Sequence, residues 1–197
     1  MPDRTTDELL LERAEGGDQA AFVELYERHR TGIFRFAYRM LGSMEMAEDI
    51  AHDCFLSLIK RPENFDPRRG SLKTYLYSAA RNLSLKYFRN AAREAAVEKF
   101  GEQPSIPVRE QPLGRLLGEE LSSKVKEAVF NLPPLQREAL VLFEYEGLTL
   151  SEIASVVGAD VGAVKARLYR ARERLRSTLL PYLNSSQEIV TRIEAAR

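Results

Sequence analysis

Apolar side chains recur at helical spacing along almost the whole chain, and this periodicity constrains the fold more than any other feature of the sequence. Runs in which polar and apolar residues alternate are absent, so no strand is predicted. The one long break is residues 101–114, which hold three prolines and show little periodicity. We therefore predict an all-α fold of two helical domains, residues 1–100 and 116–180, joined by a flexible linker at 101–115 and followed by a tail at 181–197.

Capping residues and helix breakers predict where the helices of the first domain begin and end. Asp18 and Ser71 are suitable N-caps, while Gly16, Gly17 and Gly42 terminate the helices that precede them. The predicted helices cover about residues 6–15, 18–41, 44–60 and 71–99.

In the second domain the same reasoning predicts a helix-turn-helix. Thr149 and Glu152 form a capping box, and Gly158 supplies the turn before a helix capped by Asp160. Pro181 is expected to end that last helix. The predicted helices cover about residues 116–130, 133–147, 149–157 and 160–180, and the tail is expected to form a weak amphipathic turn or two, or to fray.

The last predicted helix carries a local excess of positive charge, although the whole chain has 29 basic and 29 acidic residues. Residues 160–178 include six Lys or Arg and two Asp or Glu. Its predicted buried stripe is Val161, Val164, Leu168, Ala171 and Leu175. A solvated basic face is one interpretation. The capping box, the glycine turn and the apolar register together favour entry into the major groove of DNA.

Two stretches of the first domain have opposite charge. Residues 43–59 contain four acidic residues and no Lys or Arg, which indicates either a solvated face or a surface for a basic partner. Residues 65–93 contain seven Lys or Arg against one Asp, with aromatic residues near the start. Basic charge with interleaved aromatics suits unstacked bases as well as duplex phosphates, although aromatics in a helical domain can equally be core. The predicted buried positions there are Leu72, Leu76, Ala79, Leu83 and Tyr87.

Composition argues against several other classes of function. The single cysteine, Cys54, lies in an apolar stripe and is predicted to be buried. With only His29 and His52 beside it, no metal site is expected, and no cofactor is predicted. The acidic N-terminus does not resemble a signal peptide, and no apolar run is long enough to span a membrane. We therefore expect a cytoplasmic chain without direct membrane insertion.

Three segments resemble bacterial sigma factors of the sigma-70 family. AEDIAHDCF at residues 47–55 is similar to their core-polymerase-binding signature, and FDPRRGSLKTYLYSAARN at residues 65–82 is similar to their promoter-melting segment. LPPLQREAL at residues 132–140 resembles the opening of their C-terminal domain. The motifs stand in family order across residues 18–180. The short length and Pro-rich linker resemble the extracytoplasmic-function (ECF) subgroup, which keeps only the second and fourth conserved regions.

The resemblance implies a sigma factor that binds core RNA polymerase, directs it to specific promoters and helps to melt promoter DNA. Contact with core polymerase is implied for Glu48, Asp49, His52, Asp53 and Phe55. Contact with the minus-ten element is implied for Asn64, Phe65, Arg68, Lys73, Tyr75, Asn82, Lys86, Arg89 and Arg93. Contact with the minus-thirty-five element is implied for Val161, Gly162, Ala163, Lys165, Arg167 and Arg170. An anti-sigma factor is a further implied partner, and it could hold the chain at the inner face of the membrane.

Some observations keep other interpretations open. The family usually has Trp where Tyr75 stands, and this chain has no Trp. A dimeric regulator that binds a duplex operator would also contain a helix-turn-helix. An enzyme acting on nucleic acid would need a metal cluster or an activated nucleophile, and the sequence contains neither. The sequence assigns no role to the tail.

Overall fold

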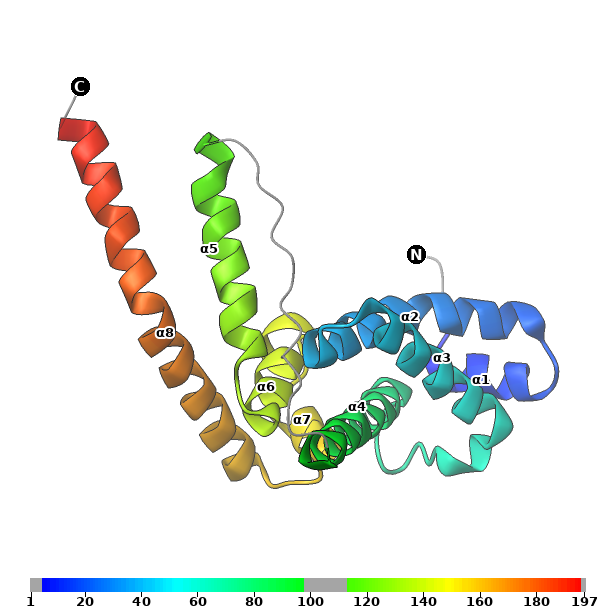
Figure 1. Cartoon of the computed structure of the whole chain (residues 1–197). Coiled ribbons are helices and arrows are strands. Elements are labelled where there is room, and N and C mark those ends of the chain that lie inside the picture. The colour runs from blue at the N-terminus through cyan, green and yellow to red at the C-terminus, as the bar shows by residue number, and fades with distance from the viewer. Residues whose placement is uncertain (1–4, 98–112, 196–197) are drawn as a thin grey trace.

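The computed structural model describes residues 5–97 and 113–195, and it describes side chains at residues 5–90 and 122–182. Within these ranges all regular structure is helical, and the predicted all-α fold of two domains is confirmed. Figure 1 shows α1 to α4 on one side of the molecule and α5 to α8 on the other. The predicted linker lies largely outside the described residues.

Local capping explains the boundaries of the helices in the first domain. Thr6 accepts a hydrogen bond from the Leu9 backbone N–H, and Asp18 accepts from the N–H groups of Ala20 and Ala21 in the first turn of α2. Gly42 ends α2 in the left-handed region at φ +74°. The helices are α1 (Asp7–Glu15), α2 (Gln19–Leu41), α3 (Met44–Lys60) and α4 (Leu72–Val97), with a short 3₁₀ turn, η1 (Pro62–Asn64), before α4.

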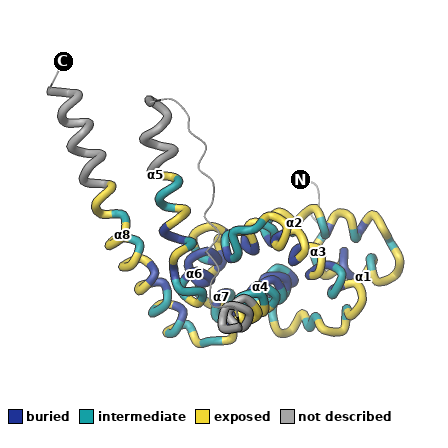
Figure 2. Tube along the Cα trace, in the orientation of Figure 1, coloured by how far each residue is buried: buried dark blue, intermediate teal, exposed yellow. Residues whose placement is uncertain are grey.

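The core of the first domain lies where α2 packs against α3 and α4. Phe36, Met40 and Leu58 are almost fully buried there, and Figure 2 shows the buried positions gathered where the helices face one another. Burying such a side chain stabilises the fold by roughly 1.5–3 kcal/mol. Cys54 is also buried, as predicted, and burial is the main cause that raises the pKa of its thiol to about 12.

The second domain contains a wide helical turn that the sequence did not predict. Its elements are α5 (Leu113–Phe130), α6 (Pro134–Leu140), η2 (Val141–Tyr145), α7 (Leu150–Val157) and α8 (Val161–Ala195). One continuous helix was predicted up to about residue 147. Instead, η2 is a π-type turn in which the Glu146 N–H donates to the carbonyl of Val141, five residues back.

The prediction that Pro181 ends the last helix is wrong. Helix α8 continues through this proline to Ala195. An interior proline removes one hydrogen bond from the helix ladder and its ring crowds the carbonyl four residues back, so a helix can continue through it only at a local cost. Side chains beyond residue 182 lie outside those that the structure describes, so the tail keeps no assigned role.

The two domains are in direct contact, chiefly where α4 packs against α7. The buried side of α4 differs from the predicted one. Ala79, Leu83 and Tyr87 were expected in the core, but they are only partly buried. The fully buried positions include Ala80 and Ser84, on a helix that packs against α2 and α3 of the first domain and against α7 of the second.

None of the described helices combines the length and the apolar character that crossing a membrane requires.

Candidate nucleic-acid interface

Three acidic residues of α3 and one histidine form one exposed surface, which we call the α3 acidic face: Glu48, Asp49, His52 and Asp53. All four are exposed, and the opposite side of the helix is buried against α2. Among the described residues none of the four takes part in an ion pair. Phe55 belongs to the core instead, where it packs edge-on against Tyr26 at 4.8 Å between ring centroids. Its side chain can support this face but is not presented on it.

The loop between α3 and α4 holds three of the side chains implied for the minus-ten element, Asn64, Phe65 and Arg68, and Tyr75 follows in the first turn of α4. Phe65 and Tyr75 pack edge to face, 5.7 Å between centroids, and both remain partly exposed. They border a polar hollow of about 300 Å³, whose lining also includes Asn64, Thr74 and Ser78. Loop and helix thus bring two aromatic rings and several hydroxyl or amide groups together around one hollow.

Arg68 projects from the same loop and contacts its neighbour Asp66. Its guanidinium donates to both carboxylate oxygens, at 3.0 and 3.1 Å, while 89% of its side chain stays exposed. The hydrogen bond from Arg68 is the main cause that lowers the pKa of Asp66. An exposed pair of this kind contributes little to stability, so the arginine can exchange its partner for a phosphate.

Helix α4 carries the predicted basic track. Asn82, Lys86 and Arg89 are all exposed, while the side chain of Arg93 lies outside the described residues. Lys73, near the start of the helix, is partly buried and donates from Nζ to the backbone carbonyl of Glu146 at 3.4 Å. Tyr77, an aromatic residue near the start of α4, is 4% exposed and packs against Phe36, so it is a core residue.

The helix-turn-helix forms as its motifs predict. The Thr149–Glu152 capping box is present in both directions, and Gly158 adopts φ +63° at the turn. Asp160 then accepts from the Ala163 N–H at 2.8 Å and starts α8. The expected buried stripe is mostly confirmed: its three central members are buried and the two outer ones, Val161 and Leu175, are partly buried.

The residues implied for the minus-thirty-five element differ in exposure. Gly162, Lys165 and Arg170 are exposed, and Val161 and Ala163 are partly exposed. Arg167 is only 19% exposed and donates from Nη1 to the Glu138 carboxylate at 3.0 Å. The exposed members give α8 a basic surface suited to a DNA groove. Arg167 instead contacts a buried carboxylate inside the second domain.

Sequence reasoning missed the charged residues at which the two domains meet. Glu138 and Glu146 of the second domain are buried, and they face Arg35, Arg39 and Arg81 of the first. The local signal in the sequence was that Arg35 and Arg39 are four residues apart and so lie on the same side of α2. It could not identify partners more than 100 residues away.

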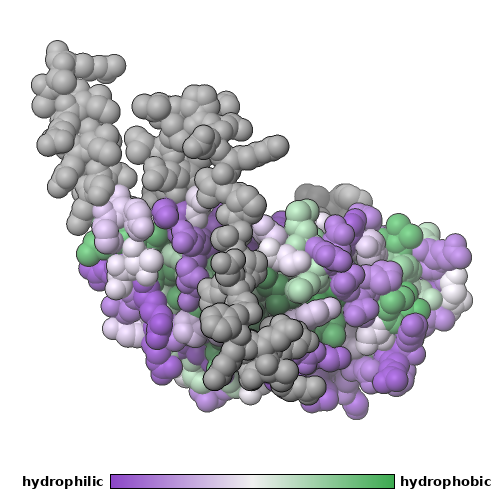
Figure 3. Space-filling view, viewed as in Figure 1, coloured by the Kyte–Doolittle hydropathy of each residue, from purple (hydrophilic) through white to green (hydrophobic). Residues whose placement is uncertain are grey.

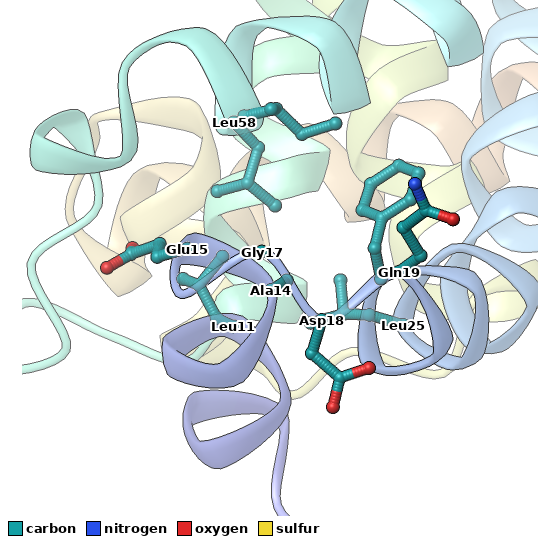
Figure 4. Close-up of a pocket in the computed structure, with 10 residues that line it drawn as sticks. Leu11, Ala14, Glu15, Gly17, Asp18, Gln19, Leu25 and Leu58 are labelled. Atoms are coloured by element: carbon teal, nitrogen blue, oxygen red, sulfur yellow. The ribbon is translucent and has the colours of Figure 1, made fainter.

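An apolar hollow of about 310 Å³ lies where α1 meets α2 and α3, lined by residues such as Leu11, Phe22 and Leu58 (Figure 4). No group of His, Cys, Asp and Glu suited to a metal ion occurs among the described residues. In Figure 3 the described part of this face is largely hydrophilic, with small separate apolar areas.

Comparison with known proteins follows the same two domains. The family model Sigma-70 region 2 matches residues 25–94, and Sigma-70, region 4 matches residues 122–175. The chain is 31% identical over 177 residues to the ECF RNA polymerase sigma factor SigW of Bacillus subtilis, covering 86% of this chain and 94% of that protein.

Two solved structures are similar across both domains. The first is CnrH in complex with the cytosolic domain of CnrY, with a TM-score of 0.64, 26% identity, and coverage of 88% of this chain and 96% of that one. The second is the sigma factor RpoE in complex with the anti-sigma factor NepR from Bartonella quintana, with a TM-score of 0.61, 26% identity, and coverage of 76% and 91%.

Proposed function

The chain belongs to the ECF subgroup of sigma-70 RNA polymerase sigma factors, so it directs transcription initiation and is not an enzyme, and we propose here how its surfaces divide that work. The observation that carries the proposal is the separation of charge. One exposed acidic face lies on α3, and one exposed basic surface lies in each domain. Acidic groups suit a protein partner with basic helices, whereas basic groups suit DNA phosphates and base edges.

We propose that the α3 acidic face binds core RNA polymerase. Its carboxylates have no ion-pair partner within the described residues, so binding requires no internal contact to break. Buried Phe55 fixes α3 against α2 and thereby sets the angle at which the face is presented.

The loop after α3 is proposed to capture an unstacked base of the minus-ten element. Phe65 and Tyr75 offer ring surface at the polar hollow, and Asn64 offers an amide for a base edge. Arg68 and Lys73 supply positive charge nearby, and a stacked base is worth roughly 1–3 kcal/mol. Asn82, Lys86, Arg89 and Arg93 would follow the phosphates along α4.

Helix α8 is proposed to read the minus-thirty-five element in the major groove. Its N-terminal residues Val161, Gly162 and Ala163 allow close approach because they are small, and Lys165 and Arg170 reach outward. Arg167 can join them only by turning from Glu138.

We also propose an anti-sigma factor as a partner, since the solved RpoE is held by the anti-sigma factor NepR and CnrH by the cytosolic domain of CnrY. The chain would then act in the cytoplasm and be restrained at the inner face of the membrane whenever its inhibitor is membrane-anchored. Affinity capture of the full chain from its native cells should recover core polymerase subunits together with one inhibitor.

Run-off transcription tests the division of work. Core polymerase and the purified chain are incubated with a pool of random DNA, and templates that support initiation are recovered and sequenced. We expect two enriched elements at fixed spacing, tight promoter binding with polymerase, and weak binding by the chain alone. A strong footprint on duplex DNA without polymerase would instead favour a dimeric regulator.

A further inference from the structure

The two domains are joined at a buried carboxylate, that of Glu146. This residue follows η2 in the second domain, and only 1% of its side chain is exposed. Its oxygens accept from Tyr77 Oη at 2.9 Å, Arg39 Nη1 at 3.3 Å and Arg35 Nη2 at 3.5 Å, all from the first domain. A carboxylate this deeply buried is held only because these donors replace water.

A second buried carboxylate, Glu138 of α6, has partners on both domains. Arg81 of α4 donates to it through Nε at 2.7 Å and Nη2 at 3.2 Å, and Arg167 of α8 donates at 3.0 Å. The side chain of Glu138 is fully buried. One acidic group therefore neutralises both an arginine of the first domain, on α4, and an arginine of the second, on α8.

This closed arrangement does not fit simultaneous contact with both promoter elements, a step that rests on the proposed function. Ser155 of α7 lines the same hollow as Phe65, so the helix-turn-helix lies directly beside the base-capture loop. The two elements, at about −10 and −35, are about 25 base pairs apart, or roughly 85 Å along B-form DNA. The domains must therefore separate on the promoter.

Separation would leave three arginines of the first domain without their carboxylate partners: Arg35, Arg39 and Arg81, which we call the arginine patch. Arg81 also donates from Nη1 to Asn82 Oδ1 at 3.4 Å. The Arg81 end of the patch therefore adjoins the exposed track of Asn82, Lys86 and Arg89 on α4. Guanidinium groups that grip carboxylates also match phosphate oxygens in geometry and charge.

We propose that the arginine patch binds promoter phosphates in the open molecule, and that Glu138 and Glu146 occupy it in the free chain. The second domain and DNA then compete for the same side chains. DNA binding by the free chain is weak because the patch is occupied, and separation of the domains on polymerase makes it available.

Binding of the full chain to a labelled 40-base-pair duplex of random sequence, measured over a range of salt concentrations, tests this competition. Glu146→Gln keeps the shape but removes the charge that holds the patch. We expect about five- to tenfold tighter binding and a larger radius of gyration by small-angle X-ray scattering. The slope of log K against log salt should steepen by about two, as two or three more phosphates are contacted. Unchanged affinity would overturn the proposal.

Two further variants separate competition from a simple loss of negative charge. Glu144→Gln removes the same charge two residues away, from an exposed pair with Arg172 inside the second domain, and should leave DNA affinity unchanged. Gly32→Ala changes no charge, but its new Cβ would lie 2.7 Å from Tyr77 Oη and 3.5 Å from Glu146 Oε2. It should open the interface and tighten binding, and because alanine favours helix it also covers the case in which Glu146→Gln folds poorly.

Removing the arginines gives the opposite prediction from a contact that only closes the molecule. Arg35→Ala with Arg39→Ala breaks the interface yet should not tighten DNA binding, and it should abolish the gain that Glu146→Gln produces. A gain that survives in the combined variant would overturn the role of the patch in DNA binding. Run-off initiation by the unaltered chain is the independent check: its absence would count against the proposed function itself, whereas its presence confines a failure to the arginine patch.

Discussion

The α3 acidic face and the buried acids of the second domain present the same kind of group, a carboxylate, in opposite environments. Asp49 and Asp53 are exposed and have no ion-pair partner among the described residues. Glu138 and Glu146 are buried and contact arginines of the first domain. Burial is the main cause that raises the pKa of Glu138, while Arg81 and then Arg167 oppose that rise. Exposed carboxylates therefore remain available for a partner, while the buried ones hold the two domains of the chain together.

The largest expected effect is the loss of a buried acid. Glu138→Ala leaves the guanidinium groups of Arg81 and Arg167 partly buried without a counter-ion, so we expect the free energy of unfolding to fall by about 3–5 kcal/mol. Urea unfolding followed by far-UV circular dichroism measures it. Glu144→Ala, which breaks the exposed pair with Arg172, should cost less than about 1 kcal/mol. Equal losses would erase the distinction between the two environments.

Reversing charge on the α3 acidic face should affect association and leave stability unchanged. Asp49→Lys with Asp53→Lys would place like charge against a basic partner, and we expect a loss of about 3 kcal/mol, on the order of a hundredfold in Kd for core polymerase. Fluorescence anisotropy with labelled protein measures it. Glu27→Lys, at an exposed position of α2, is the matched control. Unaltered polymerase affinity in the double variant would show that this face is only solvent surface.

Arg167 combines the two environments, because it contacts the buried acid Glu138 yet lies on α8, the helix proposed to read DNA. If it reads a base, Arg167→Ala should cost about 1–3 kcal/mol of promoter recognition and relax specificity at one position of the minus-thirty-five element. Holoenzyme affinity for matched and mismatched promoters measures this. Equal weakening on every sequence would mean that Arg167 contacts phosphate alone. Arg174→Ala, further along α8 and exposed, should not alter specificity.

The smallest expected effect concerns Glu152, an acid held by local hydrogen bonds. The Thr149 backbone N–H and then its hydroxyl lower the pKa of Glu152 below 4.5. A lowered folded-state pKa stabilises the fold above pH 4.5, and this contribution is lost as the pH falls through the lowered value. Thr149→Ala should cost about 1 kcal/mol at pH 7 and raise this pKa. Urea unfolding and a carboxyl NMR titration measure the two, and an unchanged pKa would exclude the hydroxyl as a significant cause.

The functional surfaces could be predicted from sequence to different extents. Exposure of Asp49, Lys86 and Lys165 follows from helical periodicity, because an amphipathic helix directs its charged side outward. Phe55 and Tyr77 are buried, and motif resemblance had implied that Phe55 contacts core polymerase together with its exposed neighbours. A motif identifies positions that act together and does not separate those that touch a partner from those that support the surface.

The sequence alone determined the helices, their caps and the helix-turn-helix, because Asp18, Gly42, Thr149 and Gly158 act on backbone groups within a few residues of themselves. Only the tertiary structure decided how the domains meet, since Glu146 finds Arg39 across more than 100 residues of chain. The π-type turn before Glu146 and the continuation of α8 past Pro181 also escaped prediction. Partners in a distant helix depend on packing, and no local pattern of residues encodes them.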